Sequence, residues 1–295
     1  MTNQASRNLK QTLDRQDIKD KIIKAVKDLP PMPKVIIKIQ TLLIDPNSNT
    51  KQIADLIETD QAIAAKVLRM ANSSFYGMSG KVSSVQHAAV ILGFKSLAEL
   101  TTVAGFSGLL GKKLSGYGYN SNELWKHSLA VALASKIISE KINPEFTNEA
   151  LTAGLIHDIG KLILDPFVLE RREAFDILLE DGNQTFLEAE KQILGFDHAE
   201  IAAEICKNWK YPEPLTLAIK YHHNPSRSNE NQMAFILHLA DYIAILSGAG
   251  YYIHEILDIR EEGTENFLSI HQKDLKNISS EILESIVKIE DELEM

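Results

Sequence analysis

Histidines and carboxylates in the second half of the chain are the residues whose types and spacing could do chemistry. Of the nine histidines, seven lie between residues 127 and 254. Imidazole nitrogens and carboxylate oxygens are ligands that suit iron, manganese, zinc and nickel, so the pattern indicates a metal site. The positions that form the pattern are Glu123, His127, His157, Asp158, Lys161, His198, His222, His223 and Asp241.

Spacing and surroundings within this set favour convergence on a metal. Glu123 and His127 are four residues apart, so they share one face of a predicted helix. His157 and Asp158 are adjacent among apolar neighbours, and the two oxygens of an aspartate can bridge two cations. Asp241 lies in the apolar run AFILHLADYIAIL. A charge in such surroundings costs several kcal/mol unless it is paired or metal-bound.

Each histidine taken alone also has an ordinary structural explanation, because histidine is of intermediate burial and usually finds a hydrogen-bond partner. We assign His87, His254 and His271 to that class. His238 precedes Asp241 by three residues and is interpreted either as a core residue or as one that orients a ligand.

The single cysteine, Cys206, limits both redox chemistry and metal ligation. One cysteine cannot form an internal disulfide, which fits a reducing cytoplasm, and it excludes a Cys-rich zinc site. Any metal must therefore take nitrogen and oxygen ligands. Cys206 itself is interpreted as a small hydrophobic core residue.

The composition is that of a soluble globular protein, with 295 residues of which 44% are hydrophobic and 24% charged. A net charge of −9 disfavours attraction to the phosphates of DNA or RNA. The first residues lack the apolar core of a signal peptide, and no apolar run reaches the roughly 18 to 20 residues of a membrane helix. We expect a cytoplasmic protein with no nucleic-acid or membrane partner.

Helices must position the candidate ligands, because apolar residues recur at three- and four-residue spacing through almost every long segment. In the first half, Ser83 or Ser84 can cap a helix that Gly93 ends. In the second half, helices are expected over residues 124–142, 149–164, 168–180, 185–194, 198–209, 215–222 and 233–246.

A segment rich in Gly, Ser and Asn, GKKLSGYGYNSN at residues 111–122, interrupts the helical period and marks a boundary. It divides an all-α chain into two helical halves, and an amphipathic stretch, Leu275–Leu293, lies near the end. The expected parts are a tail or first helix at 1–21, a helical subdomain at 22–111, a metal-binding helical subdomain at 123–248 and a C-terminal helical extension at 249–295.

The order of the candidate ligands resembles the HD superfamily of metal-dependent phosphohydrolases. It is closest in pattern to the HD-GYP cyclic-dinucleotide phosphodiesterases, whose HDIGK motif stands at residues 157–161. The first half is similar to the HDOD domain, the HD-related output domain of bacterial signalling proteins, through LPPMPKVIIKIQTLL, IADLIETDQAIAAKVLRMANSSFYG and SVQHAAVILGF. The resemblance covers roughly residues 22–225. It implies a signalling role and an N-terminal helical bundle packed on an HD-like bundle.

The resemblance also implies two sets of metal ligands that share Asp158. The sets are His127, His157, Asp158 and Asp241 for one ion, and Asp158, His198, His222 and His223 for the other. Glu123 is an optional ligand of a third ion. Lys161 is expected to face the same cavity and bind a substrate phosphate oxygen, so Asp158 and Lys161 are the catalytic candidates. Two divalent ions are expected, with iron favoured over manganese, zinc or nickel.

One departure from HD-GYP proteins leaves the activity open. After His223 the chain reads NPSRSNENQ, where those proteins carry a glutamate and a Gly-Tyr-Pro loop, and Arg227 is the one strong phosphate ligand nearby. We therefore weigh three functions. The first is a regulatory protein that retains a di-metal site and binds a signalling protein or a nucleotide or phosphate ligand. The second is a phosphohydrolase or cyclic-nucleotide phosphodiesterase that uses a metal-activated water. The third is a metal-free scaffold.

Overall fold

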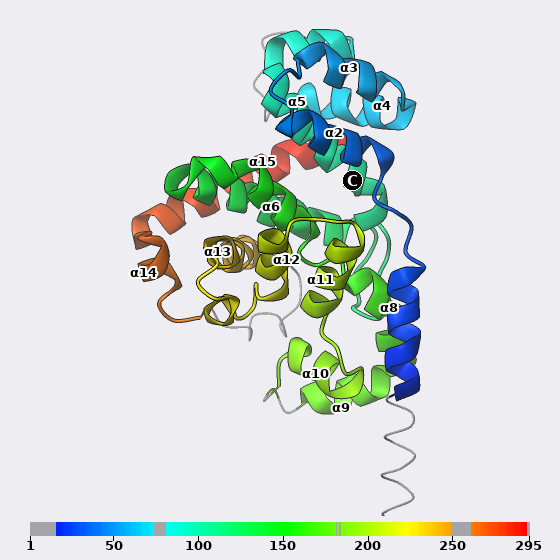
Figure 1. The fold of residues 1–295 in the computed structure, drawn as a ribbon. Helices are drawn as coiled ribbons and strands as arrows, with labels where there is room; N and C mark the ends of the chain where they lie inside the picture. Colours follow the sequence, from blue (N-terminus) through cyan, green and yellow to red (C-terminus); the bar gives the residue numbers. More distant parts are fainter. Residues whose placement is uncertain (1–15, 74–80, 181, 183, 249–260, 294–295) are drawn as a thin grey trace, which may run out of the picture.

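The computed structural model describes residues 16–73, 81–180, 182, 184–248 and 261–293, and helices make up most of this part of the chain (Figure 1). No β-strand forms within these ranges, although Leu114 and Tyr119 pair as an isolated antiparallel bridge. The all-α prediction is confirmed. After a first helix that covers residues 16–27, the elements are α2 Lys34–Ile44, α3 Thr50–Glu58, α4 Gln61–Ala71, α5 Val85–Leu110, α6 Glu123–Ile142, η1 Pro144–Phe146, α7 Thr147–Ile156, α8 Lys161–Glu170, α9 Arg172–Glu180, α10 Phe186–Ile193, α11 His198–Asn208, α12 Glu213–Lys220, η2 Pro225–Ser228, α13 Gln232–Leu246, α14 Thr264–Leu268 and α15 Gln272–Leu293.

Polar side chains begin the helices of the first half. Asn49 and Gln52 form a capping box at the start of α3, and the Asp60 carboxylate accepts hydrogen bonds from the first amides of α4. Ser84 Oγ accepts a hydrogen bond of 3.1 Å from the amide of His87, so the predicted cap of α5 is at Ser84. These caps fix where each helix begins.

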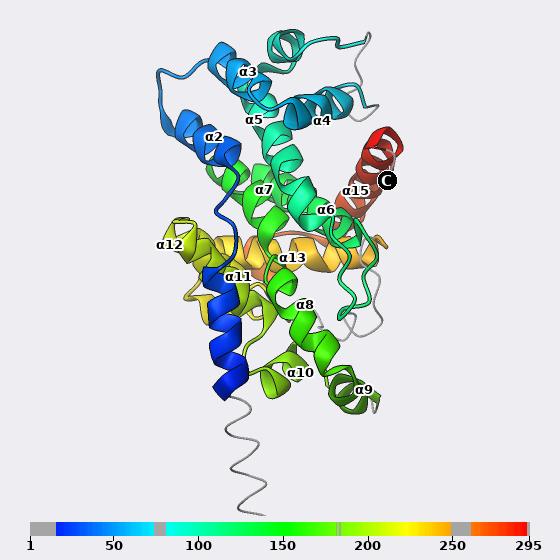
Figure 2. The ribbon, with the colours of Figure 1, turned by 90° about the vertical axis from the view of Figure 1, so that its right-hand side faces the viewer.

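Helix α5 holds the first half together. It packs against α2, α3 and α4, and its lower part reaches α6 and α7 (Figure 2). Gly93 has φ +75° and is not helical, so the helices predicted on its two sides meet at a kink. Among the described residues, α5 is the one helix long and apolar enough to span a membrane. Half of its most apolar window is nevertheless buried, as in a core helix.

The second half is built around α6, which packs against α7 and α13. α9 and α10 lie at the end of the molecule opposite α2–α5 (Figure 1). The C-terminal helix α15 contacts α4, α6 and α13, so it ties the two halves together. The two predicted halves therefore pack against each other through α15.

Two segments that were predicted as a tail or first helix and as a linker both pack against the second half. Residues 16–27 form one helix across the predicted boundary between residues 21 and 22, and Lys19 lies over the ring of Phe196 in the second half. The segment 111–122 lies against α8 and α9. Its Gly116 amide donates to Asp165 Oδ1 at 2.7 Å, and Arg172 Nη1 donates to the Gly116 carbonyl at 3.1 Å.

The single helix predicted over 149–164 is wrong, because the chain makes a turn at residues 157–160 between α7 and α8. Bonds to the third preceding residue replace the α-helical pattern, for example from the Lys161 amide to the Asp158 carbonyl at 3.0 Å. Gly160 permits a close approach of α11, since a Cβ there would lie 2.0 Å from the His198 carbonyl oxygen. The turn brings the His157–Asp158 pair beside the start of α11.

The contact between α6 and α7 gives a stability prediction. A Cβ at Gly154 would lie 2.7 Å from Ala132 Cα, so Gly154→Ala forces two helix backbones apart and should cost about 1–3 kcal/mol. Gly108→Ala is the matched control. Gly108 is an exposed helical glycine of α5 with open space around its Cα, and the change should stabilise by up to about 1 kcal/mol. Urea midpoints measure both effects, and equal shifts in the same direction would contradict the prediction.

Candidate metal centre

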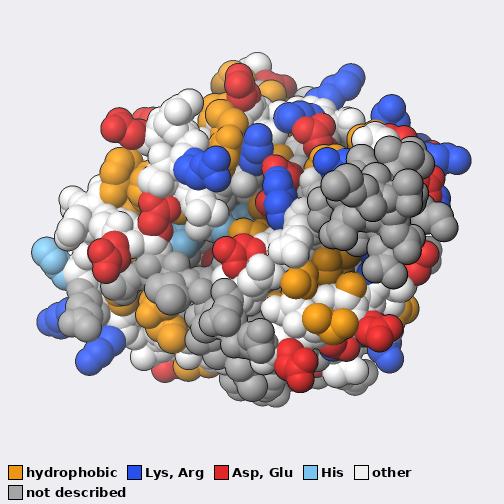
Figure 3. Space-filling model, turned by 90° about the horizontal axis from the view of Figure 1, so that it is seen from below, with side chains coloured by type: hydrophobic (Ala, Val, Ile, Leu, Met, Phe, Trp, Pro, Cys, Tyr) orange, Lys and Arg blue, Asp and Glu red, His pale blue; other side chains and the backbone are white. Residues whose placement is uncertain are grey.

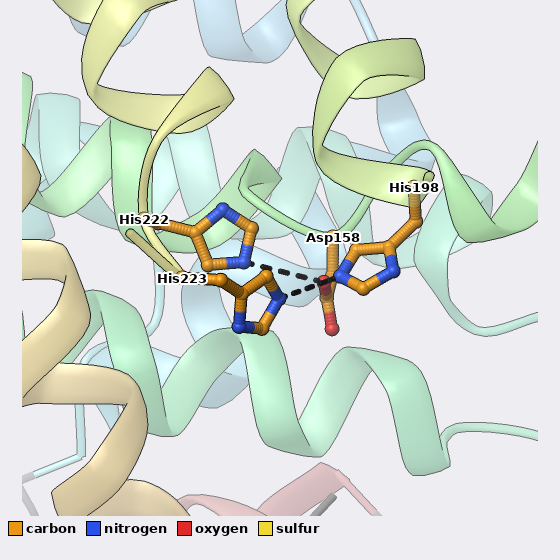
Figure 4. A group of neighbouring side chains, drawn as sticks. All are labelled: Asp158, His198, His222 and His223. Atoms are coloured by element: carbon orange, nitrogen blue, oxygen red, sulfur yellow. Dashed lines mark hydrogen bonds and ion pairs between the residues drawn. The ribbon is translucent and has the colours of Figure 1, made fainter. Parts of the chain in front are cut away.

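Five elements bring seven of the predicted ligands together. These elements are α6, the turn after α7, the start of α11, the turn after α12, and α13. Figure 4 shows four of them, with His198, His222 and His223 arranged around Asp158. The candidate ligands form three groups, and within each group the ligand atoms lie within 4.8 Å of one another. The groups are Asp158, His198, His222 and His223; His127, His157 and Asp158; and His157, His222 and Asp241.

Asp158 is the centre of this cluster and is 2% exposed. Its Oδ2 atom lies 3.6 Å from His127 Nε2 and 3.5 Å from His157 Nε2. Its Oδ1 atom lies 3.2 Å from His198 Nε2 and 3.9 Å from His222 Nε2. The two oxygens therefore face two different groups of histidines.

Backbone carbonyls orient two of the histidines with their Nε2 atoms inward. His157 Nδ1 donates to the Gly154 carbonyl and His222 Nδ1 donates to the Ile219 carbonyl, both at 2.7 Å, because a carbonyl can only accept. Each ring thus keeps a lone pair on Nε2 when it is neutral. This is the arrangement in which a histidine binds a metal.

Several buried acceptors in the cluster make no hydrogen bond of acceptable geometry, although His198 Nε2 and His127 Nε2 each lie 3.2 Å from one of the two carboxylate oxygens among them. These acceptors are His157 Nε2, His222 Nε2, Asp158 Oδ1 and Asp241 Oδ1. Buried acceptors are normally satisfied, and leaving one unpaired costs about 1–3 kcal/mol. A divalent cation would satisfy all four acceptors, so the donor set fits a metal ion.

Electrostatics keeps these groups in their metal-binding protonation states. Burial lowers the pKa of His157 and His223, and burial together with His157 lowers the pKa of His222 to about 3. Burial raises the pKa of Asp158 and Asp241, but Lys161 beside Asp158 and His127 beside Asp241 outweigh it and hold both pKa values below the usual range. Neutral imidazoles and ionised carboxylates are the forms that bind metals.

His198 differs from the other histidines because a buried carboxylate holds it. Glu190 on α10 is fully buried, and its Oε2 accepts from His198 Nδ1 and from the His198 amide, both at 2.8 Å. Burial lowers the pKa of His198, but Glu190 and Asp158 outweigh it and raise the pKa to about 9. A protonated His198 donates from Nε2 to His223 Nε2 at 2.8 Å. Metal binding must displace that proton.

Lys161 lies inside the cluster, in an ion pair with Asp158. Its Nζ is 2.8 Å from Asp158 Oδ2 and donates to Tyr119 Oη at 3.3 Å. The rings of Tyr117 and Tyr119 lie 5.8 and 5.4 Å from the same atom. Lys161 therefore neutralises part of the carboxylate charge, and its role toward a phosphate stays a prediction.

Two other predicted residues lie apart from these groups. The Glu123 carboxylate accepts from the amide and the side chain of Asn120, at 2.7 and 3.0 Å, and Glu123 is in none of the three ligand groups. Arg227 is exposed on η2. The spacing of four residues places Glu123 and His127 on one face of α6. It does not predict that the Glu123 carboxylate accepts hydrogen bonds from Asn120 at the start of that helix.

Three supporting residues complete the site. The sequence analysis missed Glu190 and Tyr117. Glu190 lies in the charged run EAEKQ of an amphipathic helix, and Tyr117 lies in a Gly-rich segment, and both patterns are typical of solvent-exposed segments. His238, left open between two roles, holds the His222 backbone. Its Nδ1 donates to the His222 carbonyl and its Nε2 accepts from the Glu261 amide, both at 2.7 Å.

Two cavities adjoin the cluster. The space among the ligands themselves is about 20 Å³, close to the volume that one water molecule needs. A cavity of about 730 Å³ lies beside it, with Tyr117, Tyr119 and Phe175 among its walls, and Phe186 borders both spaces. Figure 3 shows histidine side chains at the bottom of a hollow on this face.

The fold and site define an all-helical protein with a His-Asp pair in one turn and further histidines on the surrounding helices and turns. The HDOD domain model matches residues 29–225, and the chain belongs to the HDOD family. This confirms the family that the sequence resembles.

Solved structures share the fold over nearly the whole chain. An HDOD domain protein of unknown function from Geobacter sulfurreducens has a TM-score of 0.77 at 25% identity, and the match covers 95% of this chain and 99% of that one. A protein from Shewanella amazonensis, named only as a candidate phosphohydrolase, has a TM-score of 0.71 at 22% identity, covering 92% and 98%.

Curated relatives add no activity. An uncharacterized protein of Treponema pallidum is 22% identical over 72% of this chain, and the uncharacterized protein YuxH of Bacillus subtilis is 31% identical over 39%. The matches span 40% and 27% of the lengths of those relatives. Any activity of the whole protein is therefore a matter for proposal.

Proposed function

We propose that this protein is a cytoplasmic, regulatory HDOD protein of signal transduction whose second half binds two divalent metal ions. The observation that carries the metal site is the convergence of four buried acceptors that make no hydrogen bond. Their free energy cost in the metal-free protein becomes binding energy when a cation is present.

The proposed ligands divide at Asp158, as in the HD-GYP set. One ion would be held by His127, His157, Asp158 and Asp241, and the other by Asp158, His198, His222 and His223. The two carboxylate oxygens, which face different histidines, support this division. Nitrogen and oxygen ligands without thiolate suit iron, which we favour, and also manganese, zinc or nickel. Bound metal would supply positive charge for an anionic ligand.

Regulation is favoured over hydrolysis by the size and charge of the site. The space among the ligands is only about 20 Å³, so a phosphodiester would have to lie mainly in the adjoining cavity of about 730 Å³. Lys161 is already paired with Asp158 at 2.8 Å. The proposed partner is a signalling protein, or a nucleotide or phosphate ligand that binds at or beside the metals.

A metal-dependent phosphohydrolase is the second candidate function, favoured by the unaltered HDIGK motif at residues 157–161. In that case the metals would activate a water and neutralise charge on the phosphoryl group. Asp158 would orient the ions, and Lys161 would have to leave its ion pair to reach a phosphate oxygen.

Metal analysis tests the proposal. Protein purified anaerobically from iron-replete cells should contain close to two equivalents of metal by mass spectrometry. Less than half an equivalent of every metal, before and after reconstitution, would sink the metal-site proposal. Incubation of the loaded protein with cyclic dinucleotides, nucleotides and bis-phosphate model substrates separates the two functions. Turnover that disappears in His157→Ala would establish the hydrolase instead.

A further inference from the structure

Glu190 is a buried carboxylate whose two oxygens accept hydrogen bonds from one candidate metal ligand, His198, and from one tyrosine, Tyr117. It is fully buried on α10. Oε2 holds the amide and Nδ1 of His198, and Oε1 accepts from Tyr117 Oη at 2.5 Å. Burying a carboxylate is costly, and these three hydrogen bonds are what stabilises it here.

We propose that Glu190 is a positioning residue for the metal ion bound by His198, His222 and His223, and that Tyr117 makes the loop of residues 111–122 part of that site. The inference rests on the proposed di-metal function. By accepting from Nδ1, Glu190 leaves His198 Nε2 to face Asp158 and His223, at 3.2 and 2.8 Å. Carboxylates that hold a metal-binding histidine in this way orient the ring and raise its basicity.

Contacts of the loop fix where Tyr117 points. Asp165 Oδ1 accepts from the amides of Gly116 and Tyr117, at 2.7 and 3.3 Å. A Cβ at Gly116 would lie 2.3 Å from the Asp165 carbonyl oxygen, so the loop can lie this close only with glycine there. The Tyr117 ring packs 5.1 Å from Phe186, one helical turn before Glu190 on α10.

The connection runs from the loop that joins the two halves to a single metal ligand. Tyr117 positions Glu190, and Glu190 positions His198, while the backbone carbonyls of Gly154 and Ile219 position His157 and His222. A change at Glu190 should therefore weaken one ion and leave the other. Selective loss of one ion is not what general destabilisation of the fold produces.

Manganese titration followed by electron paramagnetic resonance tests the proposal on the full chain at pH 7.5. The variants are Glu190→Gln, which is isosteric but uncharged, Tyr117→Phe, and Glu188→Gln as matched control. Glu188 is exposed on the same helix, and its capping role at Thr185 is one that glutamine also fills. We expect wild type to bind two Mn²⁺.

In Glu190→Gln, one of the two affinities should fall by about 10- to 100-fold and the other by less than about twofold. Tyr117→Phe should weaken the same ion by about two- to tenfold, and Glu188→Gln should match wild type. Nitrogen-15 shifts of His198 should show a proton on Nδ1 in loaded wild type and a mixture of tautomers in Glu190→Gln.

Equal affinities in Glu190→Gln and wild type, or equal weakening of both ions, would overturn the inference. If Glu190→Gln does not fold by circular dichroism, Tyr117→Phe decides, and wild-type affinity for both ions in that variant overturns it. Wild-type protein that binds no metal at all would instead refute the proposed function, so the two failures are distinguishable.

Discussion

Asp158→Asn should abolish metal uptake. The residue is 2% exposed and presents one oxygen to His127 and His157 and the other to His198 and His222. Asparagine keeps the shape but removes the negative charge and replaces one oxygen by an amide nitrogen that does not bind metals. We expect the metal content to fall from two equivalents to less than about a tenth of one by mass spectrometry.

The same substitution leaves Lys161 buried beside a neutral group. Lys161 is 4% exposed and its Nζ lies 2.8 Å from Asp158 Oδ2. Breaking a buried ion pair typically costs about 3–5 kcal/mol, so the metal-free variant should also lose stability. The double variant Asp158→Asn/Lys161→Met should regain most of that stability in urea while remaining without metal.

Asp176→Asn is the control for the removal of an aspartate as such. Asp176 is exposed on α9 and pairs with Arg172 at 2.8 Å. It should retain two equivalents of metal and wild-type stability within about 0.5 kcal/mol. Two equivalents of metal in Asp158→Asn would show that the ligand set is wrong.

The features that sequence reasoning predicted are those that depend on local pattern. Helical periodicity, the cap at Ser83 or Ser84 and the break at Gly93 each rest on residues near one another in the chain. The His157–Asp158 pair stands out because charged residues are rare in an apolar helical run. The family resemblance then joined positions that spacing alone could not relate.

The features that escaped prediction depend on tertiary contacts. Glu190 is buried only because α10 packs against the start of α11 and the loop that carries Tyr117. The turn at residues 157–160 depends on the approach of α11 to Gly160, which is nearly forty residues distant in sequence. The Glu123 carboxylate accepts a hydrogen bond from the Asn120 amide at the start of its own helix, and helical periodicity does not predict this hydrogen bond.

Metal affinity should rise with pH through a single proton. His198 has a pKa of about 9 without metal, because Glu190 and Asp158 outweigh the effect of burial, so it is protonated at pH 7. The pKa of His222 is about 3 and that of His157 is lowered by burial, so the Nε2 atoms of these rings carry no proton that a metal would have to displace. The affinity for the ion at His198 should therefore increase about tenfold per pH unit between pH 7 and 9 and level off above.

Manganese titrations at pH 6.5, 7.5, 8.5 and 9.5 measure this slope. Calorimetry in two buffers of different ionisation enthalpy counts the proton released. Glu188→Gln, the exposed control on the helix that carries Glu190, should show the wild-type slope. A slope that ends near pH 6.5, the ordinary pKa of histidine, would show that Glu190 does not hold the proton on His198.

The stability of the metal-free protein should run in the opposite direction. A pKa raised from 6.5 to about 9 contributes stability that is fully present below pH 6.5 and is lost as the pH rises through 9, by about 3 kcal/mol at most. The lowered pKa values of His157, His222 and His223 act with the other sign, since these rings must become charged on unfolding in acid. Metal-free protein should thus be most stable near pH 6.5. Because bound metal replaces the proton on His198, loading should remove the alkaline loss and leave the acid one.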